Sequence, residues 1–126
     1  ISTQGSASIE LFGAILSGNE YDSIVFNAPN RKECQYTKMD MLRLFPQVTF
    51  ESRQYSSDFF ILKKTIDTVK IVEQWCNLTA LHSSAETTEP NLPTFVNCDV
   101  VSSLFSLLMK QTKKSFEVEN AELLFN

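Results

Sequence analysis

The sequence predicts an α/β fold in which a mixed sheet is flanked by helices, and three observations support this. Residues 59–62 (FFIL) form a short apolar run rich in residues that favour strands. A helical pattern follows at once, and strand-like and helix-like segments alternate elsewhere. The 126 residues are 43% hydrophobic and include ten phenylalanines but only three glycines, as in a packed domain. We expect residues 1–126 to form a single domain or a fragment of a larger one.

Residues 56–75 are expected to form the centre of this fold. The run 59–62 fits a central strand covered on both faces, and burying its four side chains would contribute roughly 6–12 kcal/mol. Thr65 is a suitable N-cap for the helix that follows, which is expected to end near Leu78. Its predicted core face has apolar residues three and four positions apart, namely Ile66, Val69, Val72, Trp75 and Cys76.

The residues before this segment predict two helices and two short strands. An apolar stripe over residues 9–16 predicts a helix, which Gly18 or Asn19 could end in the left-handed conformation. Residues 23–26 fit a strand and residues 27–30 (NAPN) fit a turn. A second helix is predicted over 37–45, capped by Thr37, with Asp40 in its first turn and with Met41, Leu44 and Phe45 facing inward; a brief strand over 48–50 follows.

The C-terminal third predicts a loop, a helix and an edge strand. Residues 79–93 are rich in Ser, Thr, Asn and Pro, and a loop of this length is often functional but can equally be a tolerated insertion. Asn97 or Asp99 would cap the next helix. Its predicted core face is Val101, Leu104, Phe105 and Leu108, and residues 116–119 alternate like an edge strand before a last turn at 123–125.

Composition excludes several functional classes. The net charge of −4 gives no basic footprint, so we expect no nucleic-acid partner. Cys34, Cys76 and Cys98 lie far apart without metal-ligand spacing, so we expect free thiols, no metal site and no disulfide framework. No apolar run reaches the ~18 residues of a membrane span. We expect a cytoplasmic protein, while the sequon at Asn77 leaves a secretory compartment open.

Five segments, in this order, resemble the C-terminal half of a glycosyltransferase-like family with a GT-A-type α/β fold, found in bacterial, algal and large-virus polysaccharide loci. That family has a Q-[WY]-T-K-R-D element, an S-x-Q lead into an apolar strand ending in K-K-T, an E-W helix, a variable loop, and H-R-H-D-Q-S before S-L-L. The corresponding segments here are 35–40 (QYTKMD), 52–54 (SRQ) leading into 57–65 (SDFFILKKT), 72–76 (VEQWC), 90–95 (PNLPTF) and 103–110 (SLFSLLMK).

The resemblance, which spans about residues 21–110, implies transfer of a sugar from a nucleotide-sugar donor to a glycan acceptor, with Mn²⁺ or Mg²⁺ at the diphosphate. The chain departs from the family in two ways. It has no D-x-D metal motif, and residues 98–102 (CDVVS) replace the H-R-H-D-Q element. Two hypotheses follow. The chain could be the acceptor-side half of a transferase whose nucleotide-binding half is supplied elsewhere. Alternatively, it is a non-catalytic module of that fold that binds a glycan, another protein chain or a second copy of itself.

The resemblance also assigns candidate site residues. Asp58 and Asp99 are the candidate catalytic acids, and four further residues are candidate substrate ligands: Lys38, Asp40, Gln54 and Ser57. Each has a structural alternative. Lys38 and Asp40 could simply begin a solvated helix, Gln54 and Ser57 could serve turn chemistry, and Asp58 could be an exposed acid at a strand end. His82 is expected at the surface because it has no partner motif.

Overall fold

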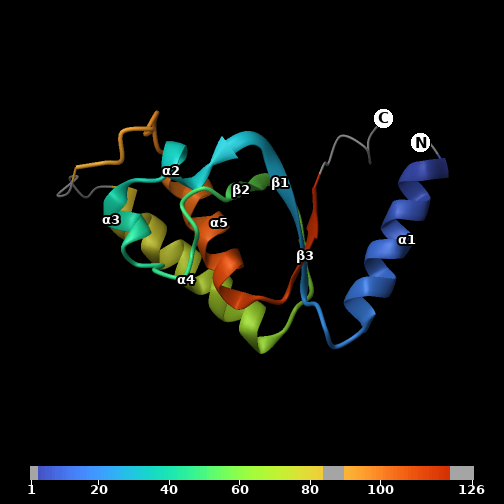
Figure 1. Ribbon diagram of the computed structural model, residues 1–126. Coiled ribbons are helices and arrows are strands. Elements are labelled where there is room, and N and C mark those ends of the chain that lie inside the picture. Colours follow the sequence, from blue (N-terminus) through green and yellow to red (C-terminus); the bar gives the residue numbers. More distant parts are fainter. Residues whose placement is uncertain (1–2, 84–89, 120–126) are drawn as a thin grey trace.

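A computed structural model describes residues 3–83 and 90–119, with side chains from residue 9 onward, and shows a mixed α/β fold (Figure 1). Three strands form one sheet in the order β2-β1-β3, in which β1 is antiparallel to β2 and parallel to β3. Helix α1 covers one face, and α4 and α5 lie on the other. The elements in chain order are α1 (Thr3–Ser17), β1 (Ser23–Lys32), α2 (Glu33–Tyr36), α3 (Met39–Leu42), β2 (Arg53–Leu62), α4 (Ile66–Ser83), α5 (Val100–Thr112) and β3 (Ser115–Val118).

Strand β1 is the centre of the sheet because its side chains are buried on both faces. Ile24 and Phe26 pack with Phe12 of α1, whereas Val25 belongs to the cluster formed with α5. The strand also runs further than the predicted 23–26. Residues 27–30 lie within it rather than in a turn, and they break the pairing register with β2. Asn30 has a φ of 57°, so the expected turn chemistry produces irregularities in a strand instead of a chain reversal.

The prediction that residues 59–62 form the central strand is wrong. They belong to β2, which lies at an edge of the described sheet and pairs with β1 alone there. Helices do cover both faces: Phe60 and Leu62 pack toward α5, and Ile61 packs toward α1. Phe59, however, is 41% exposed. An apolar run covered on both faces indicates layers of helices above and below a strand, not its place within the sheet.

Helix α4 has the predicted cap but not the predicted core face. The Thr68 amide donates to Thr65 Oγ1 (3.0 Å) and the Thr65 amide donates to Thr68 Oγ1 (2.8 Å), so Thr65 begins the helix as expected. Thr68 Oγ1 also donates to the Lys63 carbonyl (2.6 Å). The core is met instead by Ile71, Trp75 and Leu78, which pack on the cluster that contains Phe105 of α5, and four of the five predicted core residues are exposed: Ile66, Val69, Val72 and Cys76.

Helix α5 is capped by Asp99, one of the two predicted candidates, whose carboxylate accepts from the amides of Val101 (3.2 Å) and Ser102 (3.5 Å). Leu104, Phe105 and Leu108 are buried as expected, but Val101 is 44% exposed. The buried stretch is longer than predicted, because every residue from 103 to 109 is buried.

The segment between β1 and β2 is less regular than predicted. Only Met39–Leu42 of the expected helix 37–45 forms α3, and residues 48–50 form no strand. Lys38 takes the N-cap position, because the Thr37 side chain is buried and bonded elsewhere. Met41 and Phe45 are buried as predicted, whereas Leu44 is 48% exposed.

Three further predictions concern helix ends and loops. The described residues with positive φ are Asn30 and Lys113, so neither Gly18 nor Asn19 ends α1 in the left-handed conformation. Helix α4 continues to Ser83, so the predicted loop 79–93 begins later than expected; residues 84–89, like 123–125, lie outside the described residues.

Within the parts of the chain that the structure describes, no helix is both long and apolar enough to cross a membrane.

Candidate functional site

A buried carboxylate, Glu33, is the centre of a polar network between β2 and α5. Its side chain is fully buried at the start of α2. Glu33 Oε2 accepts from Lys110 Nζ (2.8 Å) and from Ser106 Oγ (2.7 Å), and Oε1 accepts from Thr37 Oγ1 (3.0 Å). Charge-assisted bonds of this kind are what make the burial of a carboxylate tolerable.

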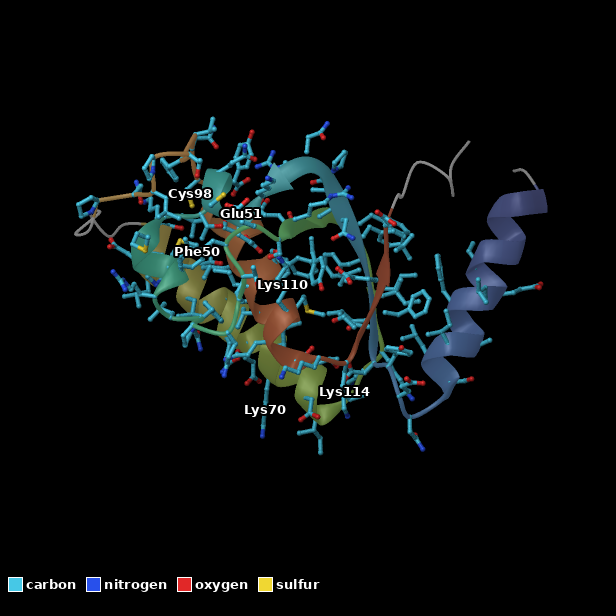
Figure 2. The ribbon with its side chains drawn as sticks, in the orientation of Figure 1. Phe50, Glu51, Lys70, Cys98, Lys110 and Lys114 are labelled. Carbon is cyan, nitrogen blue, oxygen red and sulfur yellow. The ribbon has the colours of Figure 1, made fainter. Side chains whose placement is uncertain are left out.

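Lys110 joins the carboxylate to the strand. Besides Glu33, its ammonium donates to Ser52 Oγ (2.7 Å) and to the carbonyl of Arg53 (2.6 Å). An ammonium has three donors, so these contacts use all of them. Lys110, labelled in Figure 2, therefore fastens α5 to the start of β2 and has no proton left for a ligand.

Gln54, predicted to bind substrate, belongs to the same network. It is 2% exposed, and its Nε2 donates to Thr37 Oγ1 (3.1 Å) and to Ser103 Oγ (3.2 Å). Ser103 Oγ in turn donates to the carbonyl of Tyr36 (2.6 Å). The side-chain amide therefore holds α5 to the segment before α3.

Four of the six predicted site residues line one cavity, which lies between β2 and the N-terminal end of α5. This cavity, called the serine cavity below, has a volume of about 210 Å³. Ser57 Oγ and Ser102 Oγ are hydrogen-bonded across it at 2.8 Å. Its lining residues are Ala28, Arg31, Gln54, Tyr55, Ser56, Ser57, Asp58, Asp99 and Ser102.

The two candidate acids in the serine cavity differ in their freedom to react. Asp99 is committed to α5, because Oδ1 accepts from two backbone amides and Oδ2 accepts from Ser102 Oγ (3.2 Å). Asp58 is exposed on β2. Asp58 is therefore the carboxylate of this pair that a ligand can reach without uncapping a helix.

The other two predicted ligands lie elsewhere. Lys38 is the residue before α3 and Asp40 is in the first turn of that helix, and neither lines the serine cavity. The structure thus separates the Lys38–Asp40 pair from the four residues that it brings together.

A second cavity lies at the opposite end of α5, and the sequence analysis missed it. This charged cavity has a volume of about 390 Å³ and lies between the C-terminal end of α5, β2 and β3. Its residues come from five separate segments, so no local spacing could have revealed it. They are Asn27, Gln47, Val48, Thr49, Ser52, Arg53, Tyr55, Lys110, Gln111, Lys113, Glu117 and Glu119.

Tyr55 lines both cavities. Burial raises the pKa of its hydroxyl well above the usual value, and the negative charge of Glu117, a hydrogen bond to Glu117 and the charge of Glu33 raise the pKa further. Tyr55 is thus a neutral hydrogen-bond donor at physiological pH. Next to it, Arg53 Nε donates to the carbonyl of Ala28 (3.3 Å), and Nη1 lies 3.9 Å from Glu119 Oε1.

A divalent cation, which the resemblance implies, has few ligands here. Asp99 is occupied as a cap, and no group of three or more His, Cys, Asp or Glu side chains in the described residues could hold a metal ion. Asp58 and Asp99 alone do not fit such an ion, so a metal-bound nucleotide-sugar would need ligands from outside this site.

Comparison with protein-family models, with curated proteins and with solved structures finds no match for this chain.

Proposed function

We propose that this chain is a glycan-binding module of glycosyltransferase-like origin, with a partial GT-A-like fold, and that the serine cavity holds one saccharide unit. The observation that carries the proposal is the convergence of Gln54, Ser57, Asp58 and Asp99 on one cavity. The resemblance selects these residues from segments that are separate in the sequence, and all four line this cavity.

The chemistry of the cavity suits a sugar. Each sugar hydroxyl both donates and accepts a hydrogen bond, and the lining offers groups of both kinds. The Asp58 carboxylate accepts, the Arg31 guanidinium donates, and the hydroxyl groups of Ser56 and Ser57 do either. At about 210 Å³ the cavity is small, which fits a single sugar ring better than a large ligand.

Two features favour binding over sugar transfer. Asp99 Oδ1 caps α5 and Oδ2 accepts from Ser102 Oγ, and the Gln54 amide is bonded inside the molecule. A catalytic role for Asp99 would require it to give up bonds that hold a helix end.

The second candidate function is the acceptor-side half of a nucleotide-sugar-dependent transferase, and the exposure of Asp58 at the serine cavity favours it. In that reaction Asp58 would take the proton of an acceptor hydroxyl. The acceptor oxygen would bond to the anomeric carbon as the bond to the nucleoside diphosphate breaks, with the electron pair leaving on the diphosphate. Another chain or segment would supply the donor site.

Glycan-array screening of the 126-residue chain, followed by calorimetry with each hit, tests the proposal. We expect Asp58→Asn and Ser57→Ala each to weaken binding by about tenfold, which corresponds to ~1.4 kcal/mol. The matched control is Glu10→Gln, because Glu10 is exposed on α1, across the sheet. Absence of any glycan ligand, or equal affinity for Asp58→Asn and the unaltered chain, would refute the proposal. Binding of a UDP- or GDP-sugar with Mn²⁺ would favour the transferase instead.

A further inference from the structure

We propose that the outer face of α4 docks an apolar protein segment flanked by acidic residues. The α4 face is defined here by Ile66, Val69 and Val72, with Leu62 at the end of β2 beside them. This surface is separate from the serine and charged cavities, and the proposal does not depend on glycan binding.

The apolar side chains of the α4 face are exposed together. Ile66, Val69 and Val72 follow one another at intervals of three on one helix and are 77%, 40% and 43% exposed. They line two adjoining hollows of about 600 and 330 Å³. Single exposed apolar residues are common on protein surfaces, but a contiguous hollow lined by them is typical of an interaction site.

The fold fixes α4 in this orientation. Thr65 and Thr68 exchange hydrogen bonds at its start, and Thr68 is held to the Lys63 carbonyl. Near its middle, Trp75 Nε1 donates to the Val101 carbonyl (2.9 Å). Turning α4 to bury Ile66 and Val69 would break its bonds to the carbonyls of Lys63 and Val101, so among the described residues this face of α4 is held outward.

Lysines gather around the α4 face. Lys64 and Lys70 line the hollows and are exposed. The backbones of Lys63 and Lys114 both bond to Asp22, by Lys63 N to Asp22 O (2.9 Å) and Asp22 N to Lys114 O (3.0 Å), which brings Lys114 to this end of the molecule. Figure 2 shows Lys70 and Lys114 on the same, lower side of the view.

Among the residues that line the two hollows, three are lysines, Lys63, Lys64 and Lys70, and one is a carboxylate, Glu73. Asp67 and Glu73 lie on α4 itself, Glu20 and the buried Asp22 precede β1, and Lys63 Nζ is committed to the Gly18 carbonyl (3.4 Å). On a chain with a net charge of −4, a surface with this many cations is complementary to an acidic partner rather than to the rest of the chain.

These features select one kind of occupant. An amphipathic helix with apolar residues at i, i+3, i+4 and i+7 would lay its apolar stripe along Ile66, Val69 and Val72, with its glutamates near Lys64 and Lys70. A second copy of this chain is a poor occupant. A two-fold contact places the same patch on both sides, so it would bring two lysine-rich patches together without the acidic complement that this surface favours.

Fluorescence anisotropy with designed peptides tests the proposal on the full 126-residue chain. The first labelled peptide is an 18-residue helix with a leucine stripe and glutamates on its remaining face, and the second carries lysine at every glutamate position. We expect the glutamate peptide to bind at least tenfold more tightly than the lysine peptide, and its affinity to fall as salt rises. Equal binding of the two peptides, or no binding of the glutamate peptide at millimolar concentration, overturns the proposal.

Matched variants locate the contact. Val69→Ser with Val72→Ser should weaken the glutamate peptide at least tenfold. The control is Leu81→Ser, since Leu81 is 62% exposed near the end of the same helix but outside the hollows. An unchanged affinity in the double variant would overturn the proposal. Two further outcomes would overturn it. One is binding of the chain to anionic vesicles, and the other is self-association in solution, in each case abolished by the double variant and not inhibited by the glutamate peptide.

Discussion

Helices α4 and α5 lie on the same side of the sheet, yet α5 is largely buried and α4 is largely exposed. Helix α5 has seven consecutive buried residues, 103 to 109, including two serines. Helix α4 has eighteen residues, of which Thr68 and Ile71 are buried while Ile66, Val69 and Val72 are exposed. The difference in burial follows from where each helix lies in the fold. Helix α5 is inserted among β2, α4 and the α2–α3 segment, and its buried serines hydrogen-bond to that segment, whereas α4 is the outer layer.

The largest effect should come from removing an aromatic side chain where the two helices meet. Phe105 of α5 is 1% exposed and packs at a tilt against Phe60 (4.5 Å between ring centroids) and Trp75 of α4 (5.0 Å). We expect Phe105→Ala to lower the free energy of unfolding by about 4 kcal/mol, because it leaves a cavity. Ile66→Ala on α4 should change that free energy by less than about 0.5 kcal/mol. Urea unfolding of both variants makes the comparison, and similar losses would contradict the assigned layers.

A somewhat smaller loss is expected when the buried ion pair of α5 is broken. Lys110→Met leaves the fully buried Glu33 without its cation and should cost about 3 kcal/mol of unfolding free energy, measured in the same way. Adding Glu33→Gln removes the charge that was left behind. The double variant should therefore be more stable than Lys110→Met alone, and a strictly additive loss would show that Glu33 and Lys110 do not act as a pair.

Removing the N-cap of either helix should lower the stability by similar amounts. Asp99→Ala should destabilise the protein by about 1 kcal/mol by freeing the amides at the start of α5, and Thr65→Ala should act similarly on α4. Asp99→Asn, which retains a capping oxygen, should restore most of the stability, as measured by thermal unfolding. If Asp99→Asn is as unstable as Asp99→Ala, the carboxylate has a role beyond capping.

The smallest effect is confined to alkaline pH. The pKa of Tyr55 is raised in the folded state, so between the ordinary tyrosine value of about 10 and the folded value the unfolded chain binds fewer protons than the folded chain. Stability contributed by Tyr55 is therefore complete below about pH 10 and is lost as the pH rises further. Urea unfolding at pH 9, 10 and 11 should show a steeper decline for the unaltered protein than for Tyr55→Phe. Tyr21→Phe is the control, and an equal decline in Tyr55→Phe would exclude Tyr55 as the source.

The same contrast shows what the sequence could predict. Caps were found at Thr65 and Asp99 because a cap depends on residues within one turn. Thr37, predicted on the same grounds, was wrong because its side chain is buried and bonded to Glu33. The predicted α4 core face was wrong because the helix carries two apolar stripes, and spacing alone does not show which one packs inward. Ile71, Trp75 and Leu78 pack on the core cluster, whereas Ile66, Val69 and Val72 are exposed. Residues 59–62 were misplaced for a similar reason, since an apolar run does not reveal which strand will pair on both sides.

The residues of the candidate site that could be named from sequence are those that the proposed resemblance selects. Gln54, Ser57, Asp58 and Asp99 were selected from sequence, and they line one cavity. The Glu33–Lys110 pair and the charged cavity were not found. Their residues are far apart in the chain and carry no motif, so that only the complete fold brings them together.

The pairing of β1 with β3 has a consequence for how the molecule is assembled. Ser23 pairs with Ser115 and Phe26 with Val118, so the central strand obtains one of its two neighbours from the last described element of the chain. Bringing together segments so distant in sequence lowers the entropy of the chain before the stabilising contacts between them can form. Non-local topologies of this kind therefore fold slowly. During synthesis on the ribosome, β1 would therefore keep one edge open until residues 115–118 emerge, and an exposed strand edge is a point at which chains aggregate.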